Sequence, residues 1–267
     1  MTVQAWLNGE LIVEPEHALA ITNRGLHYGD GVFETMRLLD GQIRFLDAHV
    51  ERATEGCARL GIALSTDGLL QELSCLPRQP QPSIVKAVLV RSGAARGYRP
   101  ASNSEAMRLI MLYPWAEASS TVQAQWCSTR WSRNPRLAGL KHLNRLEQVL
   151  AQQELRDGVD EGLMLDTEGE VVSATSGNVF IVRQGKLYTP DLRLCGVRGV
   201  MRKQVIGAAR ALGFSVEECS LWPADFDRAE EAFITNALRG IRPMVQLEGQ
   251  RWPSGPIAQQ LKRALSL

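Results

Sequence analysis

Apolar and polar positions at the start of the chain alternate with the period of β-strands. Ala5-Trp6-Leu7 and Leu11-Ile12-Val13 flank the turn dipeptide Asn8-Gly9, and this pattern predicts a hairpin. A further alternating run, from Val32 to Leu38, ends at the turn Asp40-Gly41 and predicts a half-buried strand. The chain therefore begins with short strands, of which the first two pair locally.

Helical spacing follows these strands. Asp47 can cap a helix that Gly61 ends, and a second helix is predicted over 66–76. The apolar positions of the first helix are Val50, Ala53, Cys57 and Leu60. Apolar runs at 84–90 and 107–112 predict two more strands, so a small α+β unit is expected to end near Tyr113.

A proline-headed run of small and polar residues, 114–120, suits a linker between domains. It divides the chain into a small N-terminal α+β domain, 1–113, and a C-terminal domain, 121–267. In the second domain Asn144 and Glu147 resemble a capping box that opens a helix followed by Gly158. The residues of this helix expected to point inward are Leu146, Val149 and Leu150.

The rest of the second domain mixes strands and helices. Strands are predicted at 162–165, 178–183 and 186–189, followed by a helix from about Val200 to Leu212 that Gly213 ends. A strand at Phe233-Ile234 and a tail helix near 257–266 complete the predicted elements.

Composition narrows the possible partners. The 267 residues carry a formal net charge of only +1, which gives no overall field to attract nucleic acid or an anionic membrane. The five cysteines are scattered without a CxxC pair, and no apolar run approaches the ~20 residues of a membrane span. We therefore expect a reduced, cytoplasmic protein without structural zinc, whose partners have to be inferred from local sites.

Lys141 lies between apolar neighbours, three residues ahead of the predicted helix cap. Loss of water there would lower the pKa of its ammonium group, and the neutral amine is the form that attacks a carbonyl or removes a proton. From spacing alone, a solvated lysine is the more frequent outcome.

His49 and Arg52 share one face of their predicted helix and could bind a phosphate together, although a solvated helix face explains them as well. Gly196-Val197-Arg198-Gly199 precedes the helix at Val200, where exposed N–H groups and the helix dipole favour an anion. A plain helix entry is the alternative. A solvated turn is the default expectation for the loop Arg96-Gly97-Tyr98-Arg99. Its arginines and tyrosine, or Arg37 at the end of its strand, could also bind a substrate carboxylate.

Several segments, taken in order, resemble the fold-type IV pyridoxal-phosphate enzymes, which include branched-chain and D-amino-acid aminotransferases and aminodeoxychorismate lyases. The matching segments are Arg24-Gly25-Leu26-His27-Tyr28-Gly29-Asp30-Gly31-Val32-Phe33-Glu34-Thr35, Leu46 to Arg52, Leu140 to Val149, Ser176 to Phe180 and Gly196 to Arg202. An ordered set of matches is far more specific than any single one. The resemblance covers nearly the whole chain.

This resemblance implies a two-domain α+β and α/β fold with pyridoxal 5'-phosphate near the domain boundary, held as a Schiff base on Lys141. It implies that Arg52, helped by His49, binds the phosphate and that Thr35 assists proton transfer near the leaving group. Further residues that it places on the cofactor are Ser173, Asn178 and the backbone N–H groups of Val197, Arg198, Asn236 and Ala237. A homodimer is expected, with a loop of the neighbour helping to close the site.

Within this group the run from Lys141 to Gln148 and the loop Arg96-Gly97-Tyr98 look most like the aminodeoxychorismate lyases, which release 4-aminobenzoate and pyruvate for folate biosynthesis. One position departs from the group: Val172-Ser173-Ala174 stands where a Thr-Glu pair usually brings a carboxylate to the pyridine nitrogen. A serine hydroxyl donates to an unprotonated nitrogen and leaves the ring a weaker electron sink.

A weaker electron sink favours elimination over transamination. The product of the lyase becomes aromatic, so this reaction needs less delocalisation of electrons into the cofactor ring than a transamination needs. Asp166, Glu168 or Glu170 could supply the carboxylate instead if the register slips. An aminotransferase acting on D-amino or branched-chain amino acids is the first alternative, and a cofactor-free binding protein on the same fold is the second. A nucleic-acid patch at 96–99 is disfavoured by the balanced charge and the lack of an aromatic platform.

Overall fold

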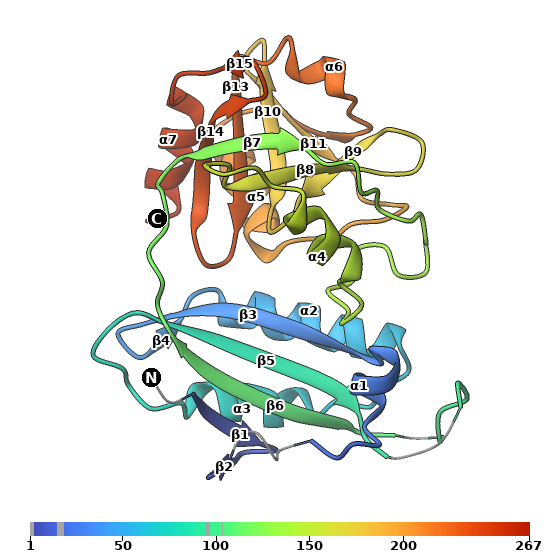
Figure 1. Ribbon diagram of the computed structural model, residues 1–267. Helices are drawn as coiled ribbons and strands as arrows, with labels where there is room; N and C mark the ends of the chain where they lie inside the picture. The colour runs from blue at the N-terminus through green and yellow to red at the C-terminus, as the bar shows by residue number, and fades with distance from the viewer. Residues whose placement is uncertain (1–2, 15–18, 94–96, 103) are drawn as a thin grey trace. The chain divides into compact units, whose positions relative to one another are not determined.

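The computed structural model describes residues 3–14, 19–93, 97–102 and 104–267. The chain divides into two compact units (Figure 1). The first unit comprises Met1–Glu117 and Leu140–Asn144, and the second comprises Ala118–Gly139 and Arg145–Leu267. A five-residue segment from the middle of the chain therefore folds with the N-terminal unit. Sequence patterns did not anticipate this return.

The first unit is built on a six-stranded antiparallel sheet with the strand order β2-β1-β6-β5-β3-β4. Its strands are β1 (Gln4–Leu7), β2 (Glu10–Ile12), β3 (Gly31–Leu39), β4 (Gln42–Ile43), β5 (Ser83–Arg91) and β6 (Ala106–Pro114). Its helices are α1 (Arg24–Tyr28), α2 (Leu46–Arg59) and α3 (Thr66–Ser74). The predicted hairpin, strands and helices of this region are confirmed, while α1 and β4 had not been predicted.

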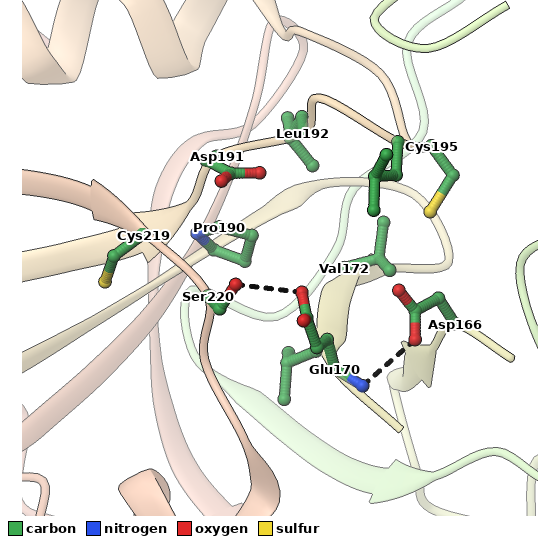
Figure 2. Close-up of a pocket in the computed structure, with 11 residues that line it drawn as sticks. Asp166, Glu170, Val172, Pro190, Asp191, Leu192, Cys195, Cys219 and Ser220 are labelled. Carbon is green, nitrogen blue, oxygen red and sulfur yellow. Dashed lines mark hydrogen bonds between the residues drawn. The ribbon is translucent and has the colours of Figure 1, made fainter. Parts of the chain in front are cut away.

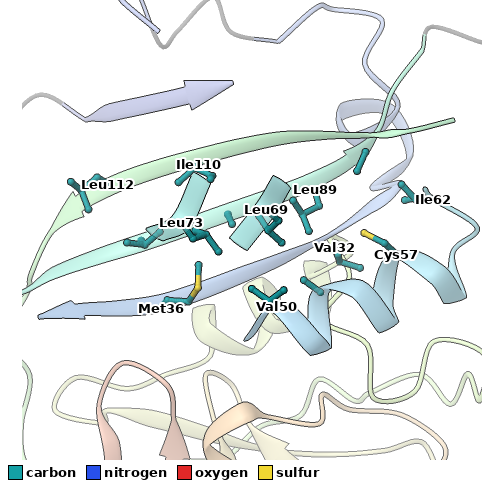
Figure 3. Packing of buried hydrophobic residues seen from close by; sticks show 14 of the residues in the cluster. Val32, Met36, Val50, Cys57, Ile62, Leu69, Leu73, Leu89, Ile110 and Leu112 are labelled. Atoms are coloured by element: carbon teal, nitrogen blue, oxygen red, sulfur yellow. The ribbon is translucent and has the colours of Figure 1, made fainter. Parts of the chain in front are cut away.

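Helices α2 and α3 cover one face of this sheet and enclose its core (Figure 3). Val32, Met36 and Leu38 of β3 point into the core, where they pack against Val50 and Cys57 of α2. Because side chains alternate along a strand, Phe33, Thr35 and Arg37 lie on the opposite face of β3. The strand thus has one face that builds the core and one that carries chemically active side chains.

The start of α2 differs from the prediction. Its N-cap is Phe45, which adopts a left-handed conformation with φ of 55° and makes no side-chain capping bond. Asp47 lies inside the first turn instead of before it. There its carboxylate still interacts favourably with the positive end of the helix dipole, so the charge pattern indicated the helix end but not the capping residue.

The second unit contains a nine-stranded sheet with the order β12-β11-β10-β13-β14-β7-β8-β9, to which β15 adds by pairing with β14. Its strands are β7 (Val122–Trp126), β8 (Glu161–Leu165), β9 (Val171–Ala174), β10 (Asn178–Arg183), β11 (Lys186–Pro190), β12 (Val216–Cys219), β13 (Glu231–Asn236), β14 (Gly240–Leu247) and β15 (Gln250–Arg251). Its helices are α4 (Leu146–Gln153), α5 (Val200–Ala211), α6 (Pro223–Phe226) and α7 (Pro256–Ala264). The strands at β8, β10, β11 and β13 and the helices α5 and α7 confirm the predictions.

Helix α4 corrects two expectations. Arg145 is its N-cap, and neither half of the predicted capping box forms. The Asn144 amide donates to the Gly29 carbonyl oxygen, while the Glu147 carboxylate accepts from the Ser132 backbone N–H. The apolar residues expected inside are exposed instead, with exposed fractions of 69% for Leu146, 49% for Val149 and 46% for Leu150.

The cysteines are free thiols, and burial raises the pKa of Cys57 and of Cys195 to about 12. Among the residues that the structure describes, none of the helices is long and apolar enough to cross a membrane.

Candidate active site

Backbone pairing fixes the segment that carries Lys141. The Phe33 N–H donates to the Lys141 carbonyl at 2.9 Å, and the Leu143 N–H donates to the Gly31 carbonyl at 3.0 Å. His142 forms an antiparallel bridge with Val32 between these two bonds. The start of β3 thus acts as a template for the lysine segment, and it places the Lys141 Nζ 4.2 Å from the centre of the Phe33 ring.

Gly29 explains part of the glycine-rich signature that precedes β3. It adopts a left-handed conformation with φ of 61°, and a Cβ atom there would lie 2.6 Å from the Asn144 Oδ1. The Asn144 amide donates to the Gly29 carbonyl at 3.2 Å. A side chain at this position would push away the residue that closes the lysine segment, so both the backbone conformation and the packing require glycine.

Glu34 joins the two residues that were predicted to bind phosphate. Its carboxylate accepts from Arg52 Nε at 2.8 Å and from Arg52 Nη2 at 2.5 Å, and it contacts His49 Nδ1 at 2.6 Å. His49 and Arg52 do share one side of α2, as predicted. They meet there through a buried carboxylate that sequence reasoning had treated only as part of a signature. A buried carboxylate in a strand opposite a His-x-x-Arg helix is the signal that could have indicated this contact.

The charge of this cluster is fixed by its arginine. Burial raises the pKa of Glu34, but the charge of Arg52 and the hydrogen bonds from His49 and Arg52 outweigh it and lower the pKa to about 2. Glu34 occupies the edge of the Arg52 guanidinium formed by Nε and Nη2, so these two donors are already used within the protein. Among the described residues, the buried Nε2 of His49 has no hydrogen-bond partner.

The N-terminus of α5 is braced by Asn178. The Asn178 amide donates to the Val197 carbonyl at 2.8 Å, and its Oδ1 accepts from the Gly199 N–H at 3.1 Å. A Cβ atom at Gly199 would lie 2.1 Å from that oxygen, so only glycine fits. The side chain of Asn178 therefore positions the turn before the helix, and the first-turn N–H groups, from Val200 onward, have no acceptor within α5.

Four residues were predicted to bind phosphate through their backbone N–H groups, and the structure shows contacts of two of them, Arg198 and Asn236. The Arg198 N–H already donates to the Gly139 carbonyl at 3.0 Å, which ties the turn to the strand-like run before Lys141. Asn236 ends β13, and its side chain donates to the Ser176 carbonyl and accepts from the Arg239 N–H. Val197 and Ala237 stay as predicted donors.

Ser173 lies in β9 and is 4% exposed. Its hydroxyl oxygen accepts from the indole Nε1 of Trp131 at 3.2 Å. Since a hydroxyl has one proton to donate, an oxygen that is held as an acceptor directs this proton elsewhere. Trp131 was not singled out in the sequence, because nothing local links it to a strand 42 residues later.

Two of the three carboxylates that could have replaced Ser173, those of Asp166 and Glu170, are engaged elsewhere. β9 pairs with β8 so that Met164 lies opposite Ser173, which fixes the register. The Asp166 carboxylate accepts from the Glu168 and Glu170 N–H groups and from Arg133 Nε. The Glu170 carboxylate accepts from the Ser220 hydroxyl (Figure 2). The cavity between them measures about 20 Å³, which is room for a water molecule and not for a cofactor ring.

A second buried acid, Glu161, supports the other end of this region. It accepts from Arg242 Nη2 at 2.8 Å and from the Thr175 hydroxyl at 2.7 Å. It also accepts from the N–H and the hydroxyl of Ser176. This carboxylate therefore fixes the turn that leads into Asn178.

Arg24 holds the loop that was predicted to bind substrate. It is 4% exposed, and it donates to the Gly97 carbonyl at 2.8 Å and to the Tyr98 carbonyl at 3.2 Å. Asp30 accepts from Arg24 and from Arg91, which in turn donates to the carbonyls at the end of α2. The backbone at Tyr98 is thus anchored while its side chain is 88% exposed. Arg96 lies outside the described residues.

Comparisons with known proteins agree with these features. The family described as amino-transferase class IV matches residues 31–247. An aminodeoxychorismate lyase from Vibrio harveyi is 30% identical over 98% of this chain and 99% of its own. A solved 4-amino-4-deoxychorismate lyase from Pseudomonas aeruginosa is 37% identical, with a TM-score of 0.91 over 98% of this chain and 97% of its own.

Aminotransferases are similar as well. A branched-chain amino acid aminotransferase of T.th. origin, solved with pyridoxamine 5'-phosphate, is 25% identical, with a TM-score of 0.84 over 98% of this chain and 92% of its own.

The Glu34 cluster predicts a pH dependence of stability. The pKa of this carboxyl is lowered from 4.5 to about 2 in the folded state, so its stabilising effect is complete above pH 4.5 and is lost as the pH falls toward 2. We expect Glu34→Gln to cost about 3 kcal/mol in free energy of unfolding near neutral pH, and less in acid. Urea unfolding at neutral pH and near the acid limit measures this difference.

Glu10→Gln, at an exposed glutamate of β2, is the matched control and should follow the unsubstituted protein throughout. An equal loss of stability for Glu34→Gln at every pH would contradict the assignment.

Proposed function

The chain belongs to the class IV aminotransferase family, and we propose that its own reaction is the elimination that converts 4-amino-4-deoxychorismate into 4-aminobenzoate and pyruvate. The observation that carries this choice is Ser173, a neutral side chain held by Trp131 at the position where the aminotransferase pattern places a carboxylate. The likeness to lyases from two bacteria supports it.

The cofactor is pyridoxal 5'-phosphate. Three features of the protein fit this group. The Lys141 amine lies on a segment that backbone pairing with β3 holds in place, and Arg52 is partly buried with its guanidinium fixed by Glu34. The third feature is the N-terminus of α5, where only glycine fits at position 199. Lys141 would hold the cofactor covalently. When bound, the cofactor supplies an electron-withdrawing ring conjugated to the amino group of the substrate.

Lys141 is the base of the proposed reaction. Its neutral amine would remove the proton from the ring carbon of the substrate that carries the amino group. The ether C–O bond then breaks, and the departing enolpyruvate takes up a proton to become pyruvate while the ring becomes aromatic. Phe33 lies beside the amine and its apolar ring excludes water from one side of it.

Thr35 is proposed to hold the proton that the leaving group needs. It lies two residues after Phe33 on the same face of β3, so its hydroxyl and the Lys141 amine are presented from one surface. A hydroxyl can donate a proton to the departing oxygen and accept another in return.

Ser173 tunes the pyridine nitrogen in this proposal. The Trp131 indole occupies an acceptor position of the hydroxyl oxygen, which leaves the hydroxyl proton to be donated to an unprotonated ring nitrogen. Amino-group transfer would have to hold negative charge in the ring until reprotonation, and a protonated nitrogen stabilises that charge better. Elimination is favoured by the formation of an aromatic ring, so it can proceed with the weaker electron sink.

The phosphate is proposed to bind several cationic and N–H groups. In the first unit Arg52 is proposed to contribute its positive charge, with its guanidinium held by Glu34, and the orphan Nε2 of His49 is a candidate for a single hydrogen bond. In the second unit the backbone N–H groups of Val197, Asn236 and Ala237 are proposed to bind the phosphate, and Val197 lies in the turn before the positive end of α5. Asn178 contributes by bracing the turn.

Substrate carboxylates are proposed to bind the arginines on the first sheet and its loop. Arg37, Arg96 and Tyr98 are the residues concerned. Arg24 anchors the backbone at Tyr98, so replacing Arg24 would act on binding through the loop and not through direct contact.

We also propose a homodimer. The apolar face of α4, formed by Leu146, Val149 and Leu150, is exposed in the single chain, and exposed apolar patches mark contact surfaces. In a twofold dimer the same patch can meet its own copy, so one helix face serves both subunits.

Replacing Lys141 with alanine should abolish pyruvate release from enzymatically generated aminodeoxychorismate, because both the attachment and the base are removed. It should also remove the absorbance of the lysine-bound cofactor near the visible edge. A coupled pyruvate assay and a spectrum measure the two effects, with Lys186→Ala at an exposed lysine of β11 as control. Retained pyruvate release would overturn the proposal.

Replacing Ser173 with glutamate should raise the ratio of amino-group transfer to pyruvate release by about tenfold, since a nearby carboxylate would keep the ring nitrogen protonated. The ratio is measured with 2-oxoglutarate and an amino donor in parallel with the coupled assay. Ser173→Thr keeps a hydroxyl and should leave the ratio unchanged. Fast amino-group transfer by the unsubstituted enzyme would instead favour the aminotransferase.

Replacing Leu146 and Leu150 together with aspartate should convert the dimer to monomer, because two charges would face each other across the contact. Sedimentation velocity measures the change. Leu212→Asp, at an exposed leucine that caps α5, is the control and should stay dimeric. A dimer that survives the double substitution would exclude the α4 face as the interface.

A further inference from the structure

We propose that Lys86 joins Arg37 in binding the two carboxylates of a dianionic substrate, with one of these two cations beside each carboxylate. This inference rests on the proposed lyase function and adds Lys86, which no sequence motif indicated. It concerns the face of the first sheet that carries Phe33 and Thr35.

The sheet register places the two cations around Thr35. Lys86 of β5 lies directly opposite Thr35 of β3, and Ile84 lies opposite Arg37. Cβ atoms of directly opposed antiparallel residues are about 4.5–5.5 Å apart, and residues two apart on a strand are about 7 Å apart. Thr35 therefore has Lys86 beside it on the next strand and Arg37 beside it on its own strand, with all three side chains on one face.

The Phe33 ring shows that this face also carries the catalytic lysine. The Lys141 Nζ lies 4.2 Å from the ring centre, and the Lys86 Nζ lies 5.6 Å from the same centre. One aromatic ring thus contacts both ammonium groups. A molecule attached near Lys141 would have Lys86 within its immediate surroundings.

No acid on the three central strands balances these cations. Across β3, β5 and β6 the one acidic residue is Glu34, and its side chain lies with His49 and Arg52 of α2, on the core side of the sheet. In the described part of the chain, neither Lys86 nor Arg37 makes an ion pair. A surface with two unneutralised cations selects anions, because each added carboxylate gains attraction without displacing a protein carboxylate.

Arg37 is preorganised to receive a carboxylate. Its guanidinium carbon lies 4.7 Å from the centre of the Trp115 ring, which holds the planar group in one orientation. Its Nε is buried and, among the described residues, has no hydrogen-bond acceptor. Buried donors are usually satisfied, so an orphan donor on a fixed guanidinium points to a ligand that completes it. The backbone of Arg44, whose N–H donates to the Arg37 carbonyl at 3.0 Å, fixes the strand end at this point.

The count of carboxylates distinguishes the two chemistries of the family. Aminodeoxychorismate breaks into 4-aminobenzoate and pyruvate, each with one carboxylate, so the substrate carries two. A simple D-amino or branched-chain amino acid carries one. Two separated cations therefore match the lyase substrate, and they leave one cation unused with a monocarboxylate amino acid.

The test compares Lys86→Met and Arg37→Met in the complete enzyme loaded with cofactor. Each substitution should raise the KM for aminodeoxychorismate by about tenfold or more with a much smaller change in kcat, because binding of one carboxylate is lost. Lys86→Arg keeps the charge and should restore most of the affinity. Lys186→Met and Arg251→Met, at exposed strand positions of the second unit, are matched controls.

Product inhibition assigns the carboxylates separately. One variant should bind 4-aminobenzoate more weakly and the other should bind pyruvate more weakly, since each product retains one of the two carboxylates. The inference is overturned if either KM is unchanged, or if both substitutions weaken the same product only. The absorbance of lysine-bound cofactor, unchanged in both variants, verifies that the site has stayed folded.

The outcome is separable from that of the proposed function. If the unsubstituted enzyme releases no pyruvate, the lyase assignment fails regardless of Lys86. If it does and the variants match their controls, only the two-cation site is wrong.

Discussion

The antiparallel pairing between the segment Leu140–Asn144 and the start of β3 is the contact on which the site depends. The two backbone hydrogen bonds of one antiparallel bridge bring a lysine from the middle of the chain to a strand more than a hundred residues earlier. Backbone bonds do not depend on side-chain identity, so the position of the amine is set by strand geometry. Gly29 and Asn144 close this pairing, which explains why a glycine-rich run precedes the strand.

Carboxylates fix several arginines within each of the two units. Asp30 accepts from Arg24 and Arg91, Glu34 accepts from Arg52, and Glu161 accepts from Arg242. Each of these acids binds an arginine through a hydrogen bond between charged groups, and in return the guanidinium is held in one orientation. Arg37 and Lys86 differ, because the described residues supply no acid for them. The arginines bound to an acid therefore support the structure, whereas Arg37 and Lys86 are the cations proposed to bind a ligand.

Much of the fold could be predicted from local patterns, and the failures have physical causes. Strand alternation predicted β3, β5 and β6, because one face of that sheet is buried against helices. The same reasoning placed Leu146 and Val149 inside, yet they are exposed, since periodicity reveals an apolar face but not what covers it. Resemblance named Lys141, Arg52 and Ser173. The partners Glu34 and Trp131 and the cation Lys86 were missed because contacts across strands leave no local signal.

Reduction of the native enzyme with borohydride, followed by tryptic peptide mapping, tests the central claim most directly. A cofactor fixed on Lys141 blocks cleavage at that residue, so the account predicts one labelled peptide spanning Leu137 to Arg145. Lys86 is the informative comparison, because its ammonium group contacts the same Phe33 ring. A label on the peptide spanning Gln79 to Arg91, or no label on the Lys141 peptide, would contradict the account.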